Sequence, residues 1–148
     1  MTHDTATKAL KTAALATALF GLAMVLALIT PLRAVFEIFL DLVHYPLDGQ
    51  QSLSSDSAHV LTAISGGLLV GLGALIWGIT QELYAKRPDV GGRVILLGVF
   101  AWYLPDSFGS YMVGAWFNVV LNTIFLAMFV LPIVFHHQTN KKAVLARG

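Results

Sequence analysis

The sequence predicts an all-α integral membrane protein whose four transmembrane helices form a bundle, and three observations support this prediction. First, 57% of the 148 residues are hydrophobic and 11% are charged, whereas roughly a quarter of the residues are charged in an ordinary soluble domain. Second, the apolar runs are long enough to span a bilayer, because a hydrocarbon core of about 30 Å requires about 20 residues of helix. Third, the basic residues alternate between successive connections. We therefore expect one transmembrane domain over residues 1–148.

The expected spans cover approximately residues 9–30, 58–82, 91–106 and 109–135. Within them, the runs 13–30, 59–81 and 107–135 contain no Asp, Glu, Lys or Arg. The third span is the shortest, because Arg93 and Asp106 bracket its apolar run. It is long enough only if the side chain of Arg93 extends along its aliphatic stem to the lipid headgroups.

The orientation follows from Lys and Arg, which concentrate in cytoplasmic connections. The five segments before, between and after the apolar runs 13–30, 59–81, 94–105 and 107–135 carry two, one, three, none and three of these residues in chain order. This alternation predicts four spans with both termini in the cytoplasm, in a multi-pass protein that we place in a bacterial inner membrane. A three-span chain, with a re-entrant third run, would put the basic C-terminal tail outside.

Charge and composition exclude several classes of function. The formal net charge of +1 is too balanced to indicate a nucleic-acid partner, so we expect none. The absence of cysteine excludes thiolate nucleophiles, thiolate-held metals and disulfide exchange. No motif indicates a catalysed reaction. We therefore expect no catalysis by the chain itself and no cofactor, with a divalent metal as the one exception considered below.

The second expected span carries a stripe of small residues at helical spacing. Close packing drives helix association in lipid, and small residues allow two backbones to approach each other. The stripe is thus expected to form the tightest helix contact, either within the bundle, which we favour, or with a second copy or a partner subunit. It comprises Ala63, Gly67, Gly71, Ala74 and Gly78.

The last span carries two amides on one face. Asn118 and Asn122 follow Tyr111 and Ala115 at helical spacing and precede Phe125. A buried amide costs free energy unless it is hydrogen-bonded, so these side chains should face the interior of the bundle. They would either form hydrogen bonds with another helix, which we favour, or help to bind a ligand.

We assign Trp102 to the aromatic belt at the membrane interface.

Asp106 is the residue with the strongest indication of function. The segment 103–107 closes the short third span, which leaves this carboxyl group at the edge of the bilayer, where an ionisable side chain needs a partner. We expect a ligand or proton site that combines Asp106 with Asn118, Asn122 and Tyr111. The alternative is that Asp106 is a hairpin-turn residue among the lipid headgroups.

The segment 32–44, between the first two spans, is predicted to be an amphipathic helix. It places Asp41 and His44 at i, i+3 spacing, and Asp56 and His59 repeat that spacing at the start of the second span, which Ser54 or Ser55 should cap. Paired carboxylate and imidazole ligands at this spacing occur in di-iron bundles, which makes these four residues metal candidates. The alternative, which we favour, is that they are ordinary residues of a solvated loop.

The leading functional hypothesis is an accessory or interaction subunit of a membrane complex. Its partners would be the lipid bilayer and either a second copy or a larger membrane protein, docked through the small-residue stripe. The rival hypothesis is an outward-facing site for a small ligand, a proton or a metal, as part of a membrane enzyme or transporter.

Overall fold

The computed structural model describes residues 1–145, and in these residues the fold is all-helical without strands. The last three residues of the expected domain lie outside the described residues. The elements in chain order are α1 (His3–Ala27), α2 (Leu32–Val43), α3 (Asp56–Ile79), the π-helical turn η1 (Thr80–Tyr84), α4 (Pro88–Met112) and α5 (Trp116–Leu145).

Side-chain caps define where two of the long helices begin. The hydroxyl of Thr2 accepts a hydrogen bond from the N–H of Thr5 over 3.2 Å at the start of α1. At the start of α3, the hydroxyl of Ser55 accepts from the N–H of Ala58 over 3.1 Å. Each cap satisfies a backbone donor that the first turn of a helix leaves without a partner. Of the two serines expected to cap this helix, Ser55 is the one that does so.

Three helices are long and apolar enough to cross a membrane. They are α1, the continuous α3–η1 segment Asp56–Tyr84, and the Trp116–Thr139 part of α5. These helices indicate a membrane protein. α4 is not among them, so the fourth span and the orientation of the chain stay predictions.

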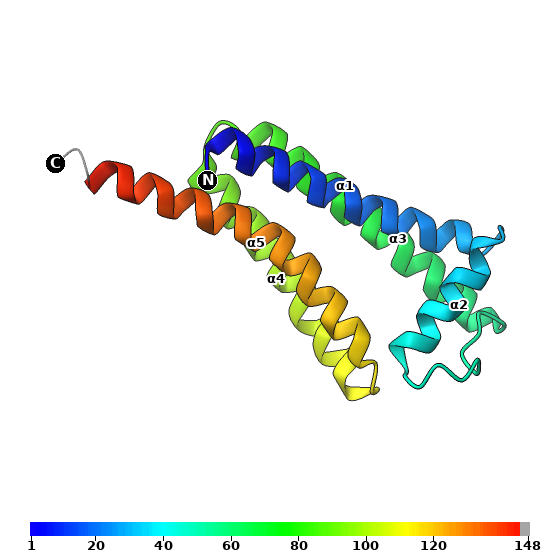
Figure 1. Ribbon diagram of the computed structural model, residues 1–148. Helices are drawn as coiled ribbons and strands as arrows, with labels where there is room; N and C mark the ends of the chain where they lie inside the picture. The colour runs from blue at the N-terminus through cyan, green and yellow to red at the C-terminus, as the bar shows by residue number, and fades with distance from the viewer. Residues whose placement is uncertain (146–148) are drawn as a thin grey trace.

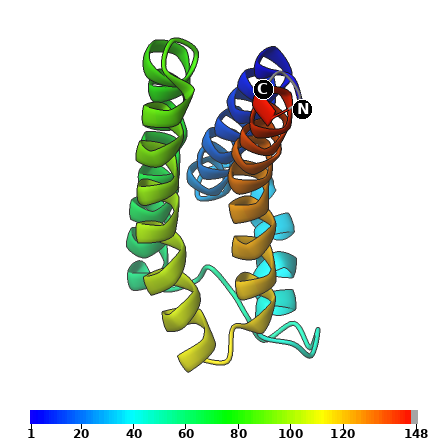
Figure 2. The ribbon, with the colours of Figure 1, turned by 90° about the vertical axis from the view of Figure 1, so that its left-hand side faces the viewer.

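The long helices are arranged as two pairs (Figure 1). α1 packs along α3, and α4 packs along α5. The pairs meet near the N-terminus and diverge toward the end of the molecule that carries α2. The view in Figure 2 shows α3 and α4 on one side of the molecule and α1 and α5 on the other, in agreement with the packing of α1 against α5.

Glycines make the contact between α1 and α3 close. A Cβ atom added at Gly21 of α1 would lie 2.5 Å from the carbonyl oxygen of Gly66 in α3. One added at Gly73 would lie 2.5 Å from the carbonyl oxygen of Ala14 in α1. No side chain fits at such distances, so the two backbones touch at these points. This is the packing that small residues permit between membrane helices.

The small-residue stripe predicted for this contact lies on another face of α3. Within residues 1–145, a Cβ atom at Gly67, Gly71 or Gly78 would have no neighbour within 4 Å, and Ala74 is exposed. The expectation that this stripe forms the tightest contact within the bundle was therefore wrong. The face that touches α1 also has small residues, Gly66 and Gly73 at i, i+7, and the spacing of glycines alone did not distinguish the two faces.

α2 is the amphipathic helix expected over residues 32–44. Its buried Phe36 packs with Leu53 of the following loop and Ala27 of α1 in a small apolar core. The ring of Phe36 also lies 6.0 Å from the ring of Phe20 in α1, measured between centroids. These contacts hold α2 against the C-terminal half of α1.

Candidate functional site

The turn between α4 and α5 determines which faces of these helices meet. Gly114 has a φ of 77°, a left-handed conformation that glycine adopts without steric cost. Its N–H donates to the carbonyl of Tyr111 over 3.1 Å, and the N–H of Ala115 donates to the carbonyl of Ser110 over 2.8 Å. These two bonds form a Schellman motif, which ends a helix at a glycine. α5 therefore returns directly along α4.

Asp106 lies inside α4, six residues before the last residue, Met112. The helix end expected near residue 106 was wrong, and residues 109–112, assigned to the last span, belong to α4. The helix continues through Pro105, although proline has no N–H to donate to the carbonyl four residues earlier. Asp106 is consequently not a hairpin-turn residue, and its side chain meets α5.

The carboxylate of Asp106 is the centre of a polar cluster between α4 and α5. Its Oδ1 atom accepts hydrogen bonds from the side-chain amides of Asn122 over 3.0 Å and of Asn118 over 3.2 Å. The hydroxyl of Ser110 donates to the same oxygen over 3.3 Å. Asn118 also donates to Ser110 over 2.8 Å, and Asn122 donates to Ser107 over 3.3 Å. The predicted association of Asp106 with Asn118 and Asn122 is thus present.

This cluster forms the polar wall of a pocket of about 460 Å³ between the two helix pairs. Asp106, Asn118 and Asn122 line it from α4 and α5, and the other lining residues are apolar apart from Ser65. Its volume lies within the range of about 300–1,000 Å³ that is usual for small-molecule sites. The apolar side chains come from all five α-helices and include Phe20, Phe39, Leu69, Trp102 and Phe125.

Tyr111 does not belong to the cluster. It is 52% exposed and packs edge-on against Trp116 with 4.7 Å between the ring centroids. Placing it with the two amides relied on its spacing from Asn118 along one continuous helix. That helix is interrupted at Gly114, so Tyr111 lies in the last turn of α4 and the direction of its side chain is set independently of α5.

The four metal candidates do not converge. Asp41 is buried and accepts the backbone N–H groups of Gly49 over 2.8 Å and Gln51 over 3.4 Å, which fixes the loop after α2. His44 is exposed and its Nδ1 pairs with the carbonyl of Leu40 over 3.2 Å in its own helix. Within the described residues, no group of three or more His, Cys, Asp and Glu side chains could hold a metal ion.

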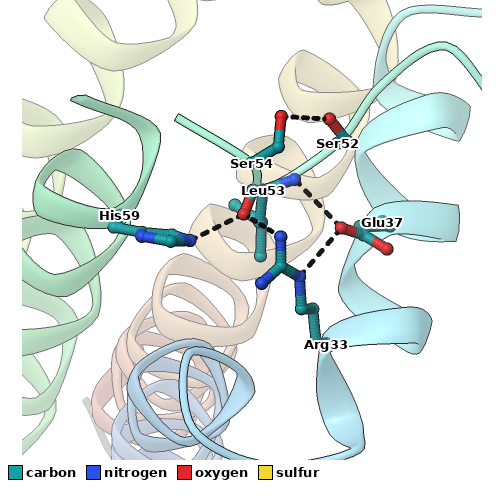
Figure 3. A network of polar contacts seen from close by, with 6 residues as sticks. All are labelled: Arg33, Glu37, Ser52, Leu53, Ser54 and His59. Carbon is teal, nitrogen blue, oxygen red and sulfur yellow. Dashed lines mark hydrogen bonds and ion pairs between the residues drawn. The ribbon is translucent and has the colours of Figure 1, made fainter. Parts of the chain in front are cut away.

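Asp56 and His59, the second pair of metal candidates, also do not converge. Asp56 is exposed in the first turn of α3. His59 points to the loop, where its Nε2 donates to the carbonyl of Leu53 over 2.6 Å (Figure 3). Its imidazole therefore helps to fix the loop and does not join the carboxylate three residues earlier.

Leu53 is held by three side chains from two helices (Figure 3). Its N–H donates to Oε1 of Glu37 over 3.1 Å, and its carbonyl accepts from the guanidinium of Arg33 as well as from His59. Arg33 and Glu37 are themselves paired over 3.1 Å, one turn apart on α2. The Arg33 hydrogen bond, followed by the N–H of Leu53, lowers the pKa of Glu37 from its ordinary value. This network ties α2 to the following loop and to the first turn of α3.

The comparisons with known proteins leave the family open. No known family model, curated protein or solved structure matches this chain. The geometry of the pocket is consequently the basis for assigning a function.

Sequence reasoning missed the apolar walls of the pocket. Trp102 was assigned to the interfacial belt, yet it lines the pocket one helical turn before Asp106. That i, i+4 spacing was the available signal, because residues four apart lie on the same face of a helix. Phe20 and Phe39 gave no comparable signal, because only the tertiary packing of α1 and α2 brings them to this pocket.

Proposed function

We propose that this protein binds a small amphiphilic ligand in the pocket between its two helix pairs. One observation carries the proposal: a single polar cluster around Asp106 stands at one wall of a pocket whose other walls are almost entirely apolar. Such a combination of apolar walls and a few convergent polar groups is typical of ligand sites. The polar wall would fix the head of the ligand and the apolar walls would enclose its chain.

The same proposal includes α4 as a fourth membrane span with both termini in the cytoplasm. α4 has 25 residues, which at about 1.5 Å per residue is long enough to cross the hydrocarbon core. It runs beside α5, which is apolar enough to span, and the ammonium group of Met1 lies 3.4 Å from the carbonyl oxygen of Phe135 near the end of α5. The alternation of Lys and Arg along the chain supports this orientation.

Binding of a neutral, environment-sensitive fluorescent probe with one alkyl chain tests the pocket. The protein would be reconstituted in nanodiscs of zwitterionic lipid, with empty nanodiscs as the blank. Ser65 is exposed and lines the pocket, so Ser65→Trp should obstruct it without disturbing the core. We expect saturable binding by the wild type and at least a tenfold loss of affinity in Ser65→Trp.

The matched control is Ile64→Trp, which adds the same ring at an adjacent exposed position that does not line the pocket. Its affinity should equal that of the wild type. Probe binding that never saturates above the blank, or that both variants weaken equally, would show that the pocket is not the site.

The second candidate function is the accessory subunit, and the exposed stripe on α3 favours it. Gly67, Gly71 and Gly78 have no neighbour among the described residues that a Cβ atom would meet. A helix of a second copy or of a partner could therefore approach this face closely. Gly71→Leu should reduce energy transfer between differently labelled copies in the bilayer at least threefold if the partner is a second copy. Unchanged energy transfer would remove the homo-oligomeric form of this candidate.

A further inference from the structure

The polar wall of the pocket presents hydrogen-bond acceptors. The side-chain amides of Asn118 and Asn122 both donate to Oδ1 of Asp106, and so does the hydroxyl of Ser110. In the described part of the chain, no side-chain hydrogen bond involves Oδ2 of Asp106 or the side-chain oxygens of Asn118 and Asn122. Three acceptor oxygens on pocket-lining residues thus remain available, whereas the amide donors are already used.

The described residues that line the pocket include a carboxylate and no cationic side chain. Among the described residues that line the pocket, Asp106 is the one charged side chain and none is His, Lys or Arg. The two amides stabilise the carboxylate by donating to it, but they carry no charge that balances it. An anion in membrane-like surroundings is costly without a cationic partner. A cationic ligand would therefore gain more here than a neutral or an anionic one.

The aromatic side chains that line the pocket also suit a cation. Trp102 lies one helical turn before Asp106, and Phe125 lies one turn beyond Leu121 on the same wall of α5. Phe20 and Phe39 complete this aromatic lining from α1 and α2, with their ring centroids 6.0 Å apart. Aromatic faces attract cations, most strongly where water is excluded. The remaining walls, such as Leu68, Leu69 and Leu72, are aliphatic and suit an alkyl chain.

We infer that the ligand is a single-chain amphiphile whose head is an N–H-bearing ammonium group. Its N–H groups donate to Oδ2 of Asp106 and to the side-chain oxygens of Asn118 and Asn122, and its chain lies between the helix pairs. This inference rests on the proposed function, because it names the ligand class of the same pocket. A phosphate next to the ammonium, as in a phospholipid head, would repel the carboxylate, so the simple amine is favoured over the lipid.

Displacement of the neutral probe by amphiphiles of equal chain length tests the inference. Dodecylamine, dodecanol and dodecanoate differ in the head, and a lysophospholipid with an ethanolamine head separates the lipid source from the free amine. In wild-type nanodiscs we expect dodecylamine to displace the probe at a concentration at least tenfold lower than dodecanol. Dodecanoate should be the weakest of the three, and the lysophospholipid should be weaker than dodecylamine.

Asp106→Asn is the decisive variant, because asparagine retains the size of the side chain and an oxygen that accepts from the amides. Measured against the probe affinity of the same variant, it should bring the potency of dodecylamine down to that of dodecanol. Asp89→Asn removes an exposed carboxylate from the same helix, outside this pocket, and should leave the preference for the amine unchanged.

The possible failures are distinguishable. Equal displacement by amine and alcohol, or an amine preference that survives Asp106→Asn, would overturn the ammonium assignment and leave the pocket in place. Absence of saturable probe binding in the wild type would overturn the proposed function itself. A lysophospholipid that matches dodecylamine and loses its potency in Asp106→Asn would support the ammonium head with a lipid as its source.

Discussion

At the scale of single residues, two carboxylates of α2 stabilise the following loop by accepting hydrogen bonds from its backbone N–H groups. Asp41 accepts the N–H groups of Gly49 and Gln51, and Glu37 accepts the N–H of Leu53. Each of these hydrogen bonds satisfies a backbone donor of the loop that follows α2. The carboxylates of Asp41 and Glu37 therefore fix the loop between α2 and α3.

The Glu37 network predicts a dependence on pH. The pKa of Glu37 is lowered from its ordinary value of 4.5, so the ionised form is favoured by folding. Its contribution to stability is present above pH 4.5 and is lost as the pH falls through the lower folded value. Below that value the protonated carboxyl should release the N–H of Leu53.

Hydrogen exchange of the 45–55 loop measures this release. On lowering the pH from 6 to 3, protection of the Leu53 amide, corrected for the intrinsic rate, should fall in the wild type. In Glu37→Gln it should be low throughout and depend little on pH. Asp48→Asn, at an exposed carboxylate in the same loop, is the control and should behave as the wild type. A pH-dependent loss that persists in Glu37→Gln would assign the effect to another group.

At the scale of helices, glycines with the same sequence signature have opposite roles on α3. Gly73 faces Ala14 and Ala18 of α1 at contact distance, whereas Gly71 faces open space. Gly73→Ala should destabilise the protein by about 1–3 kcal/mol, the usual cost of overpacking. Gly71→Ala should be neutral or stabilising by up to about 1 kcal/mol, because alanine is the better helix former.

Unfolding in mixed micelles of increasing denaturing-detergent content compares these two variants. The midpoint of Gly73→Ala should shift to lower denaturing detergent, and that of Gly71→Ala should not. Equal shifts in both variants would mean that the close approach of α1 and α3 is not as described.

Helix boundaries show what could be predicted from the sequence and what could not. Hydrophobic runs correctly indicated the apolar helices, and the periodicity of residues 32–44 correctly indicated α2. The end of α4 was missed because Pro105 and Asp106 resemble a turn, whereas Gly114 forms it. The sequence contained the correct signal, a glycine following the last helical residues, but a proline within a membrane-depth helix was taken for its end.

At the scale of the whole molecule, the polar half of the site could be predicted and the apolar half could not. A carboxylate and two amides at membrane depth each need a partner, and this requirement correctly associated Asp106 with Asn118 and Asn122. The pocket walls come from helices that diverge in space, and no local pattern encodes that divergence. For the same reason the four metal candidates, which share a side of the molecule by sequence, do not share a site.

The most direct test of the central claim is quenching of Trp102 by an amphiphile with a brominated chain. Trp102 lines the pocket, whereas Trp77 is 41% exposed on α3 outside it. Two single-tryptophan variants are compared: Trp77→Phe with Trp116→Phe retains Trp102, and Trp102→Phe with Trp116→Phe retains Trp77. We predict quenching of Trp102 that saturates and is reversed by the unbrominated amphiphile, and for Trp77 only a small quenching that rises linearly with partitioning into lipid. Linear, irreversible and equal quenching of both tryptophans would contradict the existence of a ligand site between the helix pairs.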